Sequence, residues 1–198
     1  MTVKLIPGQG MYANAYLAGG TILVDAGVTP MDIEAHKDKI THIILTHCHY
    51  DHTAYLPELV RITGAKVCIH NADVKGLNND SVSLSMLFGS HSTGIVPDIV
   101  LNGGEIMEGF EVISTPGHTP GSICLYDKEN CDLISGDTVF TDGAFGRYDF
   151  PGGDLKSLTA SLEHLAGIKV NGLYPGHGIP VRNNGERHIR AANILIHS

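Results

Sequence analysis

Six consecutive residues of the chain concentrate the side chains that bind metal ions. His47, His49, Asp51 and His52 form the pattern H-x-H-x-D-H directly after an apolar segment. In an extended backbone alternate side chains share one face, so we expect His47 and His49 to point the same way and Cys48 the opposite way. The loop that follows can bring Asp51 and His52 back beside this pair. One hexapeptide therefore offers two imidazoles for one cation and a carboxylate with an imidazole for a second.

Three further ligand-type residues each follow a glycine at the end of a predicted strand. They are His118 in TPGHTPG, Asp137 in SGDT and His177 in YPGHG. Glycine allows a tight turn that brings the next side chain into a crowded site. Taken singly, each residue is more often an ordinary turn histidine or turn aspartate than a metal ligand. With the hexapeptide they make five histidines and two aspartates, a set that suits two divalent ions bridged by a carboxylate.

Composition narrows the classes of protein to which the chain can belong. The 198 residues are 42 % hydrophobic and 17 % charged, which suits a single domain, residues 1–198, with a sizeable core. The formal net charge is -8 without a run of Lys or Arg, so we expect a small-molecule substrate and no nucleic acid. The sequence has neither an apolar run of roughly 18 residues nor a signal-peptide pattern. These features predict a cytoplasmic protein without a membrane partner. They leave the oligomeric state open, and a homo-oligomer is one alternative.

Apolar periodicity and turn residues predict two sets of strands, each followed by helices. The predicted strands are 3–6, 12–18, 21–25, 42–46, 66–69, 98–101, 110–114, 122–127, 131–135 and 170–174. The predicted helices are a short polar one at 31–39, one at 54–63 with Thr53 as N-cap, one from the N-cap Asp154 to 166, and one at 184–196. Residues 78–97 are rich in Asn, Ser and Gly, and we interpret them as a mobile lid, with a surface helix as the alternative. The two sets favour two sheets packed face to face with helices outside.

In order and along nearly the whole chain, these motifs resemble those of the metallo-β-lactamase-fold superfamily. The resemblance implies an α+β fold, an αββα sandwich of two mixed sheets flanked by helices, with the site at one edge of the sheets. By position it implies a first metal held by His47, His49 and His118, a second held by Asp51, His52 and His177, and Asp137 as the bridge. Asp25 in the segment VDAG resembles the family's early aspartate, which supports a ligand histidine from behind. An ordinary turn aspartate is the alternative for Asp25.

Two details narrow the branch within this superfamily. His49 stands where the flavodiiron oxidoreductases carry a glutamate, which disfavours a redox iron pair. The segments GDTVF (136–140) and GRYDFPGG (146–153) resemble the glyoxalase II-like branch, which contains hydroxyacylglutathione hydrolases and persulfide dioxygenases. The chain departs from the glutathione thioesterases of that branch in ending after one helix and in carrying Asp149 where those enzymes have a tyrosine. This departure puts glutathione itself in doubt as part of the substrate.

The sequence therefore predicts a dinuclear metallo-hydrolase of the glyoxalase II-like, thioesterase type. In this hypothesis a metal-bridging hydroxide, oriented by Asp51 and Asp137, attacks the carbonyl of a small thioester or ester. Zinc is the first candidate for both divalent ions. Iron and manganese are the alternatives, because His and carboxylate ligands accept all three metals.

Arg147 and Tyr148, with Phe88 and His91 of the predicted lid, are candidate substrate contacts. Arg147 can receive a substrate carboxylate through two hydrogen bonds. The alternative for Arg147 is a structural salt bridge with an acidic neighbour at position 149 or 154. His91, in a loop rich in Ser, Thr and Gly, is more often a solvated side chain.

Other functions stay open from the sequence alone. A mononuclear-iron persulfide dioxygenase shares the pattern GRxDF, although YPGHG around His177 looks more like the hydrolase form. A lactonase or a nuclease of the same fold would share every metal ligand, and the absence of a basic arm disfavours the nuclease. A non-catalytic metal-binding module would close the coordination shell, whereas a catalytic site keeps a position for water.

Overall fold

The computed structural model describes residues 2–198 and divides the chain into two compact units, Met1–Leu101 and Asn102–Ser198. Each unit contains one mixed β-sheet and its own helices. The predicted α+β class with two mixed sheets flanked by helices is confirmed. That the two units act as one domain stays a prediction. In the described part of the chain, the helices are all too short or too polar to cross a membrane.

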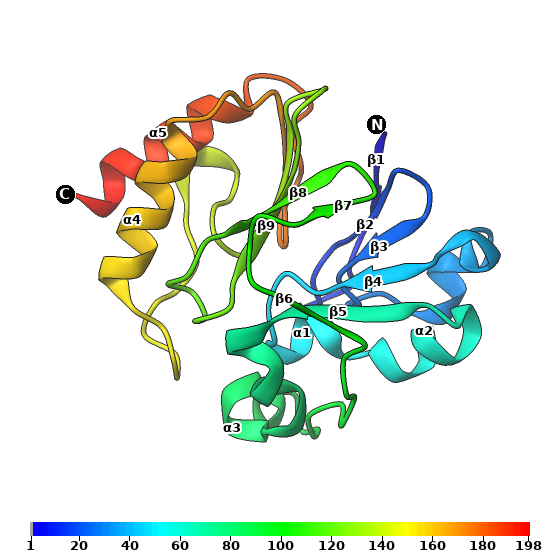
Figure 1. Ribbon diagram of the computed structural model, residues 1–198. Helices are drawn as coiled ribbons and strands as arrows, with labels where there is room; N and C mark the ends of the chain where they lie inside the picture. Colours follow the sequence, from blue (N-terminus) through cyan, green and yellow to red (C-terminus); the bar gives the residue numbers. More distant parts are fainter. Residues whose placement is uncertain (1) are drawn as a thin grey trace. The chain divides into compact units, whose positions relative to one another are not determined.

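The sheet of the unit Met1–Leu101 has six strands in sequence order. They are β1 (Val3–Ile6), β2 (Ala15–Ala18), β3 (Ile22–Val24), β4 (His42–Ile44), β5 (Lys66–His70) and β6 (Ile99–Leu101). The first three strands pair antiparallel, and β3 to β6 pair parallel. Because parallel strands end at the same edge of a sheet, the segments that follow β3, β4 and β5 emerge side by side (Figure 1). Asp25 and the hexapeptide His47–His52 both begin at this edge.

Two helices lie between positions 50 and 63, where one helix was predicted at 54–63, and the first of them begins inside the hexapeptide. They are α1 (Tyr50–Thr53) and α2 (Leu56–Thr63), and the prediction that Thr53 caps a helix over 54–63 is wrong. Thr53 lies inside α1, where its hydroxyl donates to the carbonyl of His49 at 3.2 Å. Proline is tolerated only in the first turn of a helix, so Pro57 sets the start of α2 at Leu56. The buried Leu56 and Leu59 pack α2 onto the core of this unit.

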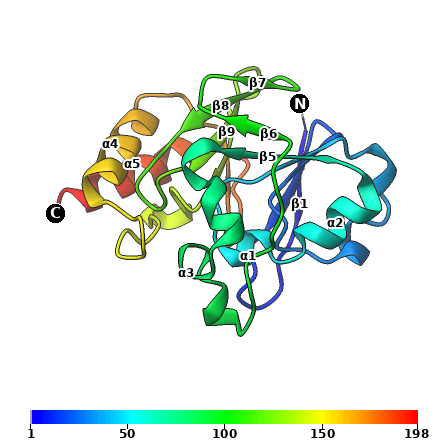
Figure 2. The same ribbon diagram turned by 60° about the horizontal axis from the view of Figure 1, so that its bottom comes forward.

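The remaining helical segments of this unit are short. The predicted helix at 31–39 is two 3₁₀ turns, η1 (Pro30–Ile33) and η2 (Lys37–Lys39). The predicted lid contains the end of η3 (Asn71–Asn78), then α3 (Asp80–Ser83) and η4 (Ser85–Phe88), and continues as irregular chain (Figure 2). The Asp80 carboxylate holds that irregular chain through His91 Nδ1 at 2.7 Å and the Ser92 amide at 2.7 Å. The lid function of residues 78–97 stays a prediction.

The sheet of the unit Asn102–Ser198 has the order β11-β10-β9-β8-β7. The strands are β7 (Ile106–Met107), β8 (Phe110–Ser114), β9 (Ile123–Asp127), β10 (Asp132–Gly136) and β11 (Gly172–Pro175). Only β10 and β11 pair parallel. The sequence pattern did not predict β7, because two residues are too few to show an alternation. The short 3₁₀ helix η5 (Thr141–Gly143) follows β10.

Two helices, α4 (Leu155–Ala166) and α5 (Gly185–Ile196), cover this second sheet and lie side by side (Figures 1 and 2). The predicted N-cap is confirmed, because the Asp154 carboxylate accepts a hydrogen bond from the Ser157 amide at 2.8 Å. The leucines at 158, 162 and 165 are buried as the periodicity predicts, whereas Leu155 in the first turn is 42 % exposed. The core of this unit therefore forms between the sheet and the apolar faces of α4 and α5.

Candidate metal centre

The first two histidines of the hexapeptide lie together, as the strand alternation predicts. His47 and His49 are buried, and their ring centroids are 4.7 Å apart. Their metal-binding nitrogens lie within 4.8 Å of each other. Cys48 points into the apolar core on the other side, where burial and the neighbouring Asp73 raise the pKa of its thiol well above the usual value. A protonated, buried thiol is a poor metal ligand, so His47 and His49 are the donors at this point.

The second half of the hexapeptide forms another donor pair. The helical turn of α1 places His52 Nε2 at 3.7 Å from Asp51 Oδ2. This separation is too long for a strong hydrogen bond. Two ligand atoms that each lie 2.0–2.1 Å from one tetrahedral ion are separated by roughly 3.3 Å. The spacing of Asp51 and His52 is therefore close to that of two ligands on a shared cation.

Asp25 holds His52 from the side opposite to Asp51. The backbone of Asp25 has a positive φ of 64°, which turns its carboxylate back toward the end of β4. Asp25 Oδ2 lies 2.8 Å from His52 Nδ1, and the carboxylate can only accept, so Nδ1 carries the proton. Nε2 of His52 is then the nitrogen that can bind a metal ion. The structure thus places Asp25 where the family resemblance implied.

Thr46 joins this arrangement, and sequence reasoning missed it. Its hydroxyl lies 2.8 Å from Asp25 Oδ2 and 3.1 Å from His47 Nδ1. The hydroxyl can donate to the Asp25 carboxylate and accept from the His47 imidazole, so it links Asp25 to His47 through two hydrogen bonds. A threonine directly before the first histidine was the only signal in the sequence.

Asp73, at the start of η3, is a second missed residue. It is 1 % exposed, and its Oδ2 accepts a hydrogen bond from the Cys48 amide at 3.0 Å. Cys48 lies between His47 and His49 in the chain, so this hydrogen bond restrains the backbone that carries both histidines. Gly76 of the same helix packs against Cys48 so closely that a Cβ there would overlap the thiol. Asp73 follows β5 at the sheet edge where the hexapeptide begins.

In the unit Asn102–Ser198, Asp137 lies between two histidines. Its Oδ2 is 3.7 Å from His118 Nε2 and 3.6 Å from His177 Nε2. Both separations again match the spacing of ligands on a common ion better than that of a hydrogen bond. One carboxylate oxygen equidistant from two imidazoles is the geometry expected of a carboxylate shared by two cations.

The parallel pairing of β10 and β11 positions Asp137 and His177. Both residues follow the carboxyl ends of these strands, and the Gly176 amide donates to the Gly136 carbonyl at 2.8 Å. Gly136 has a positive φ of 48° at a register shift that ends β10 and turns Asp137 out of the sheet.

Contacts with α4 and with the loop after β10 position His118. The Asp154 amide donates to the Gly117 carbonyl at 2.8 Å, which ties the His118 loop to the start of α4. His118 Nδ1 donates to the Arg147 carbonyl at 2.6 Å, which leaves Nε2 for a metal ion. Gly146 is required beside them, because a Cβ there would overlap the carbonyl oxygen of Asp137.

The predicted substrate contacts Arg147 and Tyr148 have different environments. The Arg147 guanidinium pairs with Asp149 through Nε at 2.9 Å and Nη2 at 2.7 Å, and it lies 4.1 Å from the centre of the Phe150 ring. This is the salt bridge that the sequence left as the alternative, and it lowers the pKa of the Asp149 carboxyl. A substrate carboxylate would have to displace Asp149. Tyr148 is 39 % exposed, and its contact with substrate stays a prediction.

Comparison with known proteins adds an independent line of evidence. The sequence profile of the Metallo-beta-lactamase superfamily matches residues 8–177, a range that includes every predicted ligand. The chain belongs to the metallo-beta-lactamase superfamily. Over 197 residues it is 38 % identical to the probable metallo-hydrolase MJ0888 of Methanocaldococcus jannaschii, which covers 90 % of this chain and 93 % of that protein.

Two further relatives of this superfamily member are informative. It is 33 % identical over 176 residues to the hydroxyacylglutathione hydrolase GloC of Haemophilus influenzae, with 82 % of each chain covered. A solved structure of TTHA1623 in a di-iron-bound form matches with a TM-score of 0.79 and 32 % identity, covering 88 % of this chain and 92 % of that one. Superfamily membership and the imidazole and carboxylate donors of both units support a metal-dependent hydrolase that binds divalent ions.

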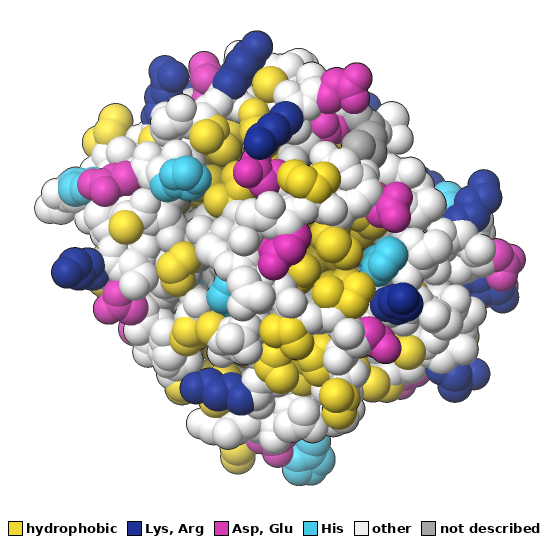
Figure 3. All heavy atoms as spheres, viewed as in Figure 1, with side chains coloured by type: hydrophobic (Ala, Val, Ile, Leu, Met, Phe, Trp, Pro, Cys, Tyr) yellow, Lys and Arg dark blue, Asp and Glu magenta, His cyan; other side chains and the backbone are white. Residues whose placement is uncertain are grey.

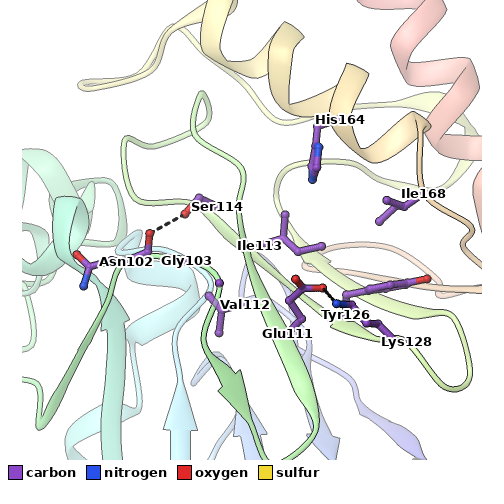
Figure 4. A pocket seen from close by; sticks show the side chains of 11 residues that line it. Asn102, Gly103, Glu111, Val112, Ile113, Ser114, Tyr126, Lys128, His164 and Ile168 are labelled. Carbon is purple, nitrogen blue, oxygen red and sulfur yellow. Dashed lines mark hydrogen bonds and ion pairs between the residues drawn. The ribbon is translucent and has the colours of Figure 1, made fainter.

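A cavity of about 490 Å³ in the unit Asn102–Ser198 is not part of this metal centre. It lies beside β8 and β9 near the end of α4, and Ile113, His164 and Ile168 are among the side chains that line it (Figure 4). At its mouth Glu111 and Lys128 form an ion pair of 2.9 Å. None of the predicted ligands lines this cavity, so this hollow and the candidate chemistry of the unit are separate features.

Proposed function

We propose that this superfamily member is a dinuclear metallo-hydrolase that cleaves a small thioester or ester, with zinc as the preferred metal. The ligands of the first ion would be His47, His49 and His118. The ligands of the second would be Asp51, His52 and His177, and Asp137 would bridge the two ions. The proposal requires the donors of the two units to meet, and the family profile that spans both units supports this.

The position of the Asp137 carboxylate is the observation that carries the proposal. Its Oδ2 lies 3.7 Å from one imidazole nitrogen and 3.6 Å from another, and the two histidines belong to different predicted metal ions. A mononuclear site needs no such shared oxygen. Because Asp137 directly follows β10, the parallel pairing of β10 with β11 fixes the backbone that carries this carboxylate.

The chemistry divides between the metal ions and the protein. Bound divalent ions lower the pKa of water and polarise the substrate carbonyl. Asp51 and Asp137 orient the attacking water, and Asp51 accepts a proton from it, while Asp25 and Thr46 keep the histidines in the correct tautomer. The water oxygen bonds to the acyl carbon, the bond from that carbon to sulfur breaks, and the thiolate leaves without needing a strong acid.

The surface supports a small substrate over a nucleic acid. On the face that Figure 3 shows, Lys and Arg side chains are dispersed, and Asp and Glu side chains lie among them. The formal net charge of -8 has the same sign as a phosphate backbone. The name of the Haemophilus influenzae relative, a hydroxyacylglutathione hydrolase, favours a thioester as the bond cleaved.

Metal content and turnover, measured on the same preparation, test the proposal. Protein purified without added metal is analysed by element, and it is then assayed with a panel of thioesters, aryl esters, lactones and RNA. We expect about two equivalents of zinc per chain and turnover of a thioester. One equivalent of iron with oxygen uptake would instead identify a persulfide dioxygenase. Metal without turnover of any of these substrates would identify a binding module.

A further inference from the structure

Three aromatic side chains from distant segments meet beside the hexapeptide. Tyr12 lies in the loop between β1 and β2, Tyr50 in α1 and Phe88 in η4. The Phe88 ring stacks on Tyr12 with centroids 5.7 Å apart, and its centroid is 5.4 Å from that of Tyr50. All three side chains are only partly buried, so they are not core residues. We call Tyr12, Tyr50 and Phe88 the aromatic patch.

The backbone ties the aromatic patch to the residues that do the chemistry. Tyr50 stands directly between His49 and Asp51 in the chain. The Ala13 amide, next to Tyr12, donates to the Asp51 carbonyl at 3.1 Å. Gly27 allows this approach, because a Cβ there would meet the Asp51 carbonyl oxygen. The patch is therefore held at a fixed position relative to the proposed catalytic carboxylate.

Exposed apolar side chains flank two members of the aromatic patch in the chain. Met11, next to Tyr12, is 64 % exposed, and Met86 and Leu87, next to Phe88, are 72 % and 66 % exposed. Leu84, which precedes η4, has a positive φ of 61°, a backbone conformation that is uncommon for leucine. Apolar side chains that gather on a surface in this way are typical of a binding site.

Two of the three segments that form the aromatic patch contain no formal charge; the third contains Asp51, next to Tyr50. Residues 5–18 and 81–97 contain no Asp, Glu, Lys or Arg, although these types make up 17 % of the sequence. His91, the histidine in these segments, is already paired with Asp80 at 2.7 Å. Burial, with the nearby Tyr55 and Tyr50, raises the pKa of Tyr12, so its phenol stays neutral. These two segments therefore offer no partner to a charged ligand group and suit an uncharged, apolar one.

We propose that the aromatic patch binds the acyl chain of the substrate, and that the physiological substrate is a thioester or ester of an apolar, uncharged acyl group. This inference rests on the proposed hydrolase function, because the acyl chain is assigned to the aromatic patch from the proposed catalytic role of the neighbouring Asp51. The acyl carbon has to reach the water that Asp51 orients, and Tyr50, the chain neighbour of Asp51, belongs to the aromatic patch. The charged peptide of glutathione finds no cation in these two segments.

A chain-length series tests the inference. The zinc-loaded full chain is assayed with N-acetylcysteamine thioesters from acetyl to octanoyl, so that only the apolar length changes and the leaving thiol stays neutral. Each methylene that enters an apolar site improves kcat/KM by about 4-fold. We expect this increase over several methylenes in the wild type. In Phe88→Ala the loss should grow with chain length, to about 10-fold or more for octanoyl, while Phe88→Leu should restore most of it.

Binding measured without turnover provides a second readout. Straight-chain carboxylates from butanoate to octanoate, which are the expected products, are titrated calorimetrically into the same proteins. Affinity should increase with length in the wild type and should stop increasing in Phe88→Ala and in Tyr12→Ala. Ile194→Ala, which removes a 73 % exposed apolar side chain from α5, is the matched control and should behave like the wild type.

The outcomes separate this inference from the proposed function. A wild type that hydrolyses no thioester or ester contradicts the proposed function. A wild type that hydrolyses them with no dependence on chain length, or with the same dependence in Phe88→Ala, overturns the inference alone. A change of oligomeric state in Phe88→Ala on sedimentation, with an unaltered chain-length dependence, would show that the aromatic patch is an interface between copies.

Discussion

The two units supply their candidate metal ligands in contrasting ways. In the unit Met1–Leu101 all the donors come from six consecutive residues, and two buried carboxylates, Asp25 and Asp73, hold that peptide from behind. In the unit Asn102–Ser198 the donors come from three loops between positions 118 and 177, and they converge on the single carboxylate of Asp137. The first cluster is therefore fixed largely by local chain geometry, whereas the second depends on strand register and helix packing.

This contrast predicts how substitutions in each cluster should affect metal binding and turnover. Loss of a supporting group in the first unit leaves the hexapeptide its own local geometry, so the damage should be graded. Loss of the shared carboxylate in the second unit removes a ligand from both proposed ions at once. The predictions below test this difference, beginning with the largest effect.

Asp137→Ala should have the largest effect. It removes the oxygen that lies near both His118 and His177. We expect turnover to decrease by about 10³-fold, the scale seen when a preorganised group at a reacting centre is removed, and metal content to fall below two equivalents. Steady-state kinetics and elemental analysis measure both. Asp142→Ala, which changes a carboxylate with a 93 % exposed side chain in the same unit, is the control, and equal behaviour of the two variants would contradict the prediction.

Asp73→Ala should have an intermediate effect in the first unit. It leaves the Cys48 amide without its carboxylate acceptor, so we expect a 10- to 100-fold weaker metal affinity. Asp73→Asn keeps an acceptor oxygen and should recover most of the affinity. Competition with a chelator measures the affinity, and the absorption spectrum of the cobalt-substituted protein reports the ligand geometry.

Asp98→Ala is the matched control for Asp73. Its Oδ2 accepts from the Val67 amide at 2.9 Å, which is an equivalent bond in the same unit away from the hexapeptide. It should lower the melting temperature without altering the metal affinity or the cobalt spectrum. If Asp73→Ala and Asp98→Ala change only stability, and by similar amounts, then Asp73 has no positioning role.

Gly146→Ala tests the packing of the second cluster. The added Cβ meets the Asp137 carbonyl oxygen and approaches His118 Nδ1 at 3.0 Å, so backbone has to shift. We expect destabilisation by about 1–3 kcal/mol together with weaker metal binding. Gly104→Ala, at a positive φ of 90° in open space, should cost backbone strain alone. Denaturant unfolding measures the stability of both variants. Equal destabilisation of the two, with unchanged metal affinity in Gly146→Ala, would rule out the packing argument.

His188 should produce the smallest effect, which depends on pH. Burial, with the charge of Arg187, lowers the pKa of His188, and its Nδ1 accepts from the Asp142 amide at 2.7 Å. The folded state therefore favours the neutral ring, and this stabilisation is present above pH 6.5 and decreases as the pH falls below that value. His188→Asn keeps an acceptor without titrating. The difference in melting temperature between wild type and variant, measured without metal, should shrink from pH 7.5 to 5.5, and a constant difference would exclude this role.

The sequence predicted the features that depend on neighbouring residues. The alternation of His47, Cys48 and His49 follows from backbone geometry, and the Asp154 cap follows from its position before an apolar helical period. The helix predicted at 54–63 is present as α2, but its start and N-cap were wrong, because the capping preference of Thr53 was weighed without the restriction that Pro57 imposes.

The residues that support the site could not be predicted in the same way. Asp73 acts through a contact that needs β4 paired with β5, and the contact of Thr46 with Asp25 needs β3 paired with β4. The sequence context of both residues resembles any strand end. The sequence left Arg147 between a salt bridge and a substrate contact, because an acidic residue two positions away in the chain does not decide whether the two side chains pair. Local patterns thus identify donors, whereas the tertiary register decides which side chains orient them.

The central claim is that donors from both units bind one paired metal centre, and a double-variant metal count tests it most directly. His47→Ala, His118→Ala and the combined variant are purified with zinc, and metal per chain is determined for each. Because both histidines are assigned to the same ion, we expect two equivalents in the wild type and about one in each single variant and in the combined variant. Complete loss of metal in the combined variant, with one equivalent in each single variant, would show two independent sites and contradict the account.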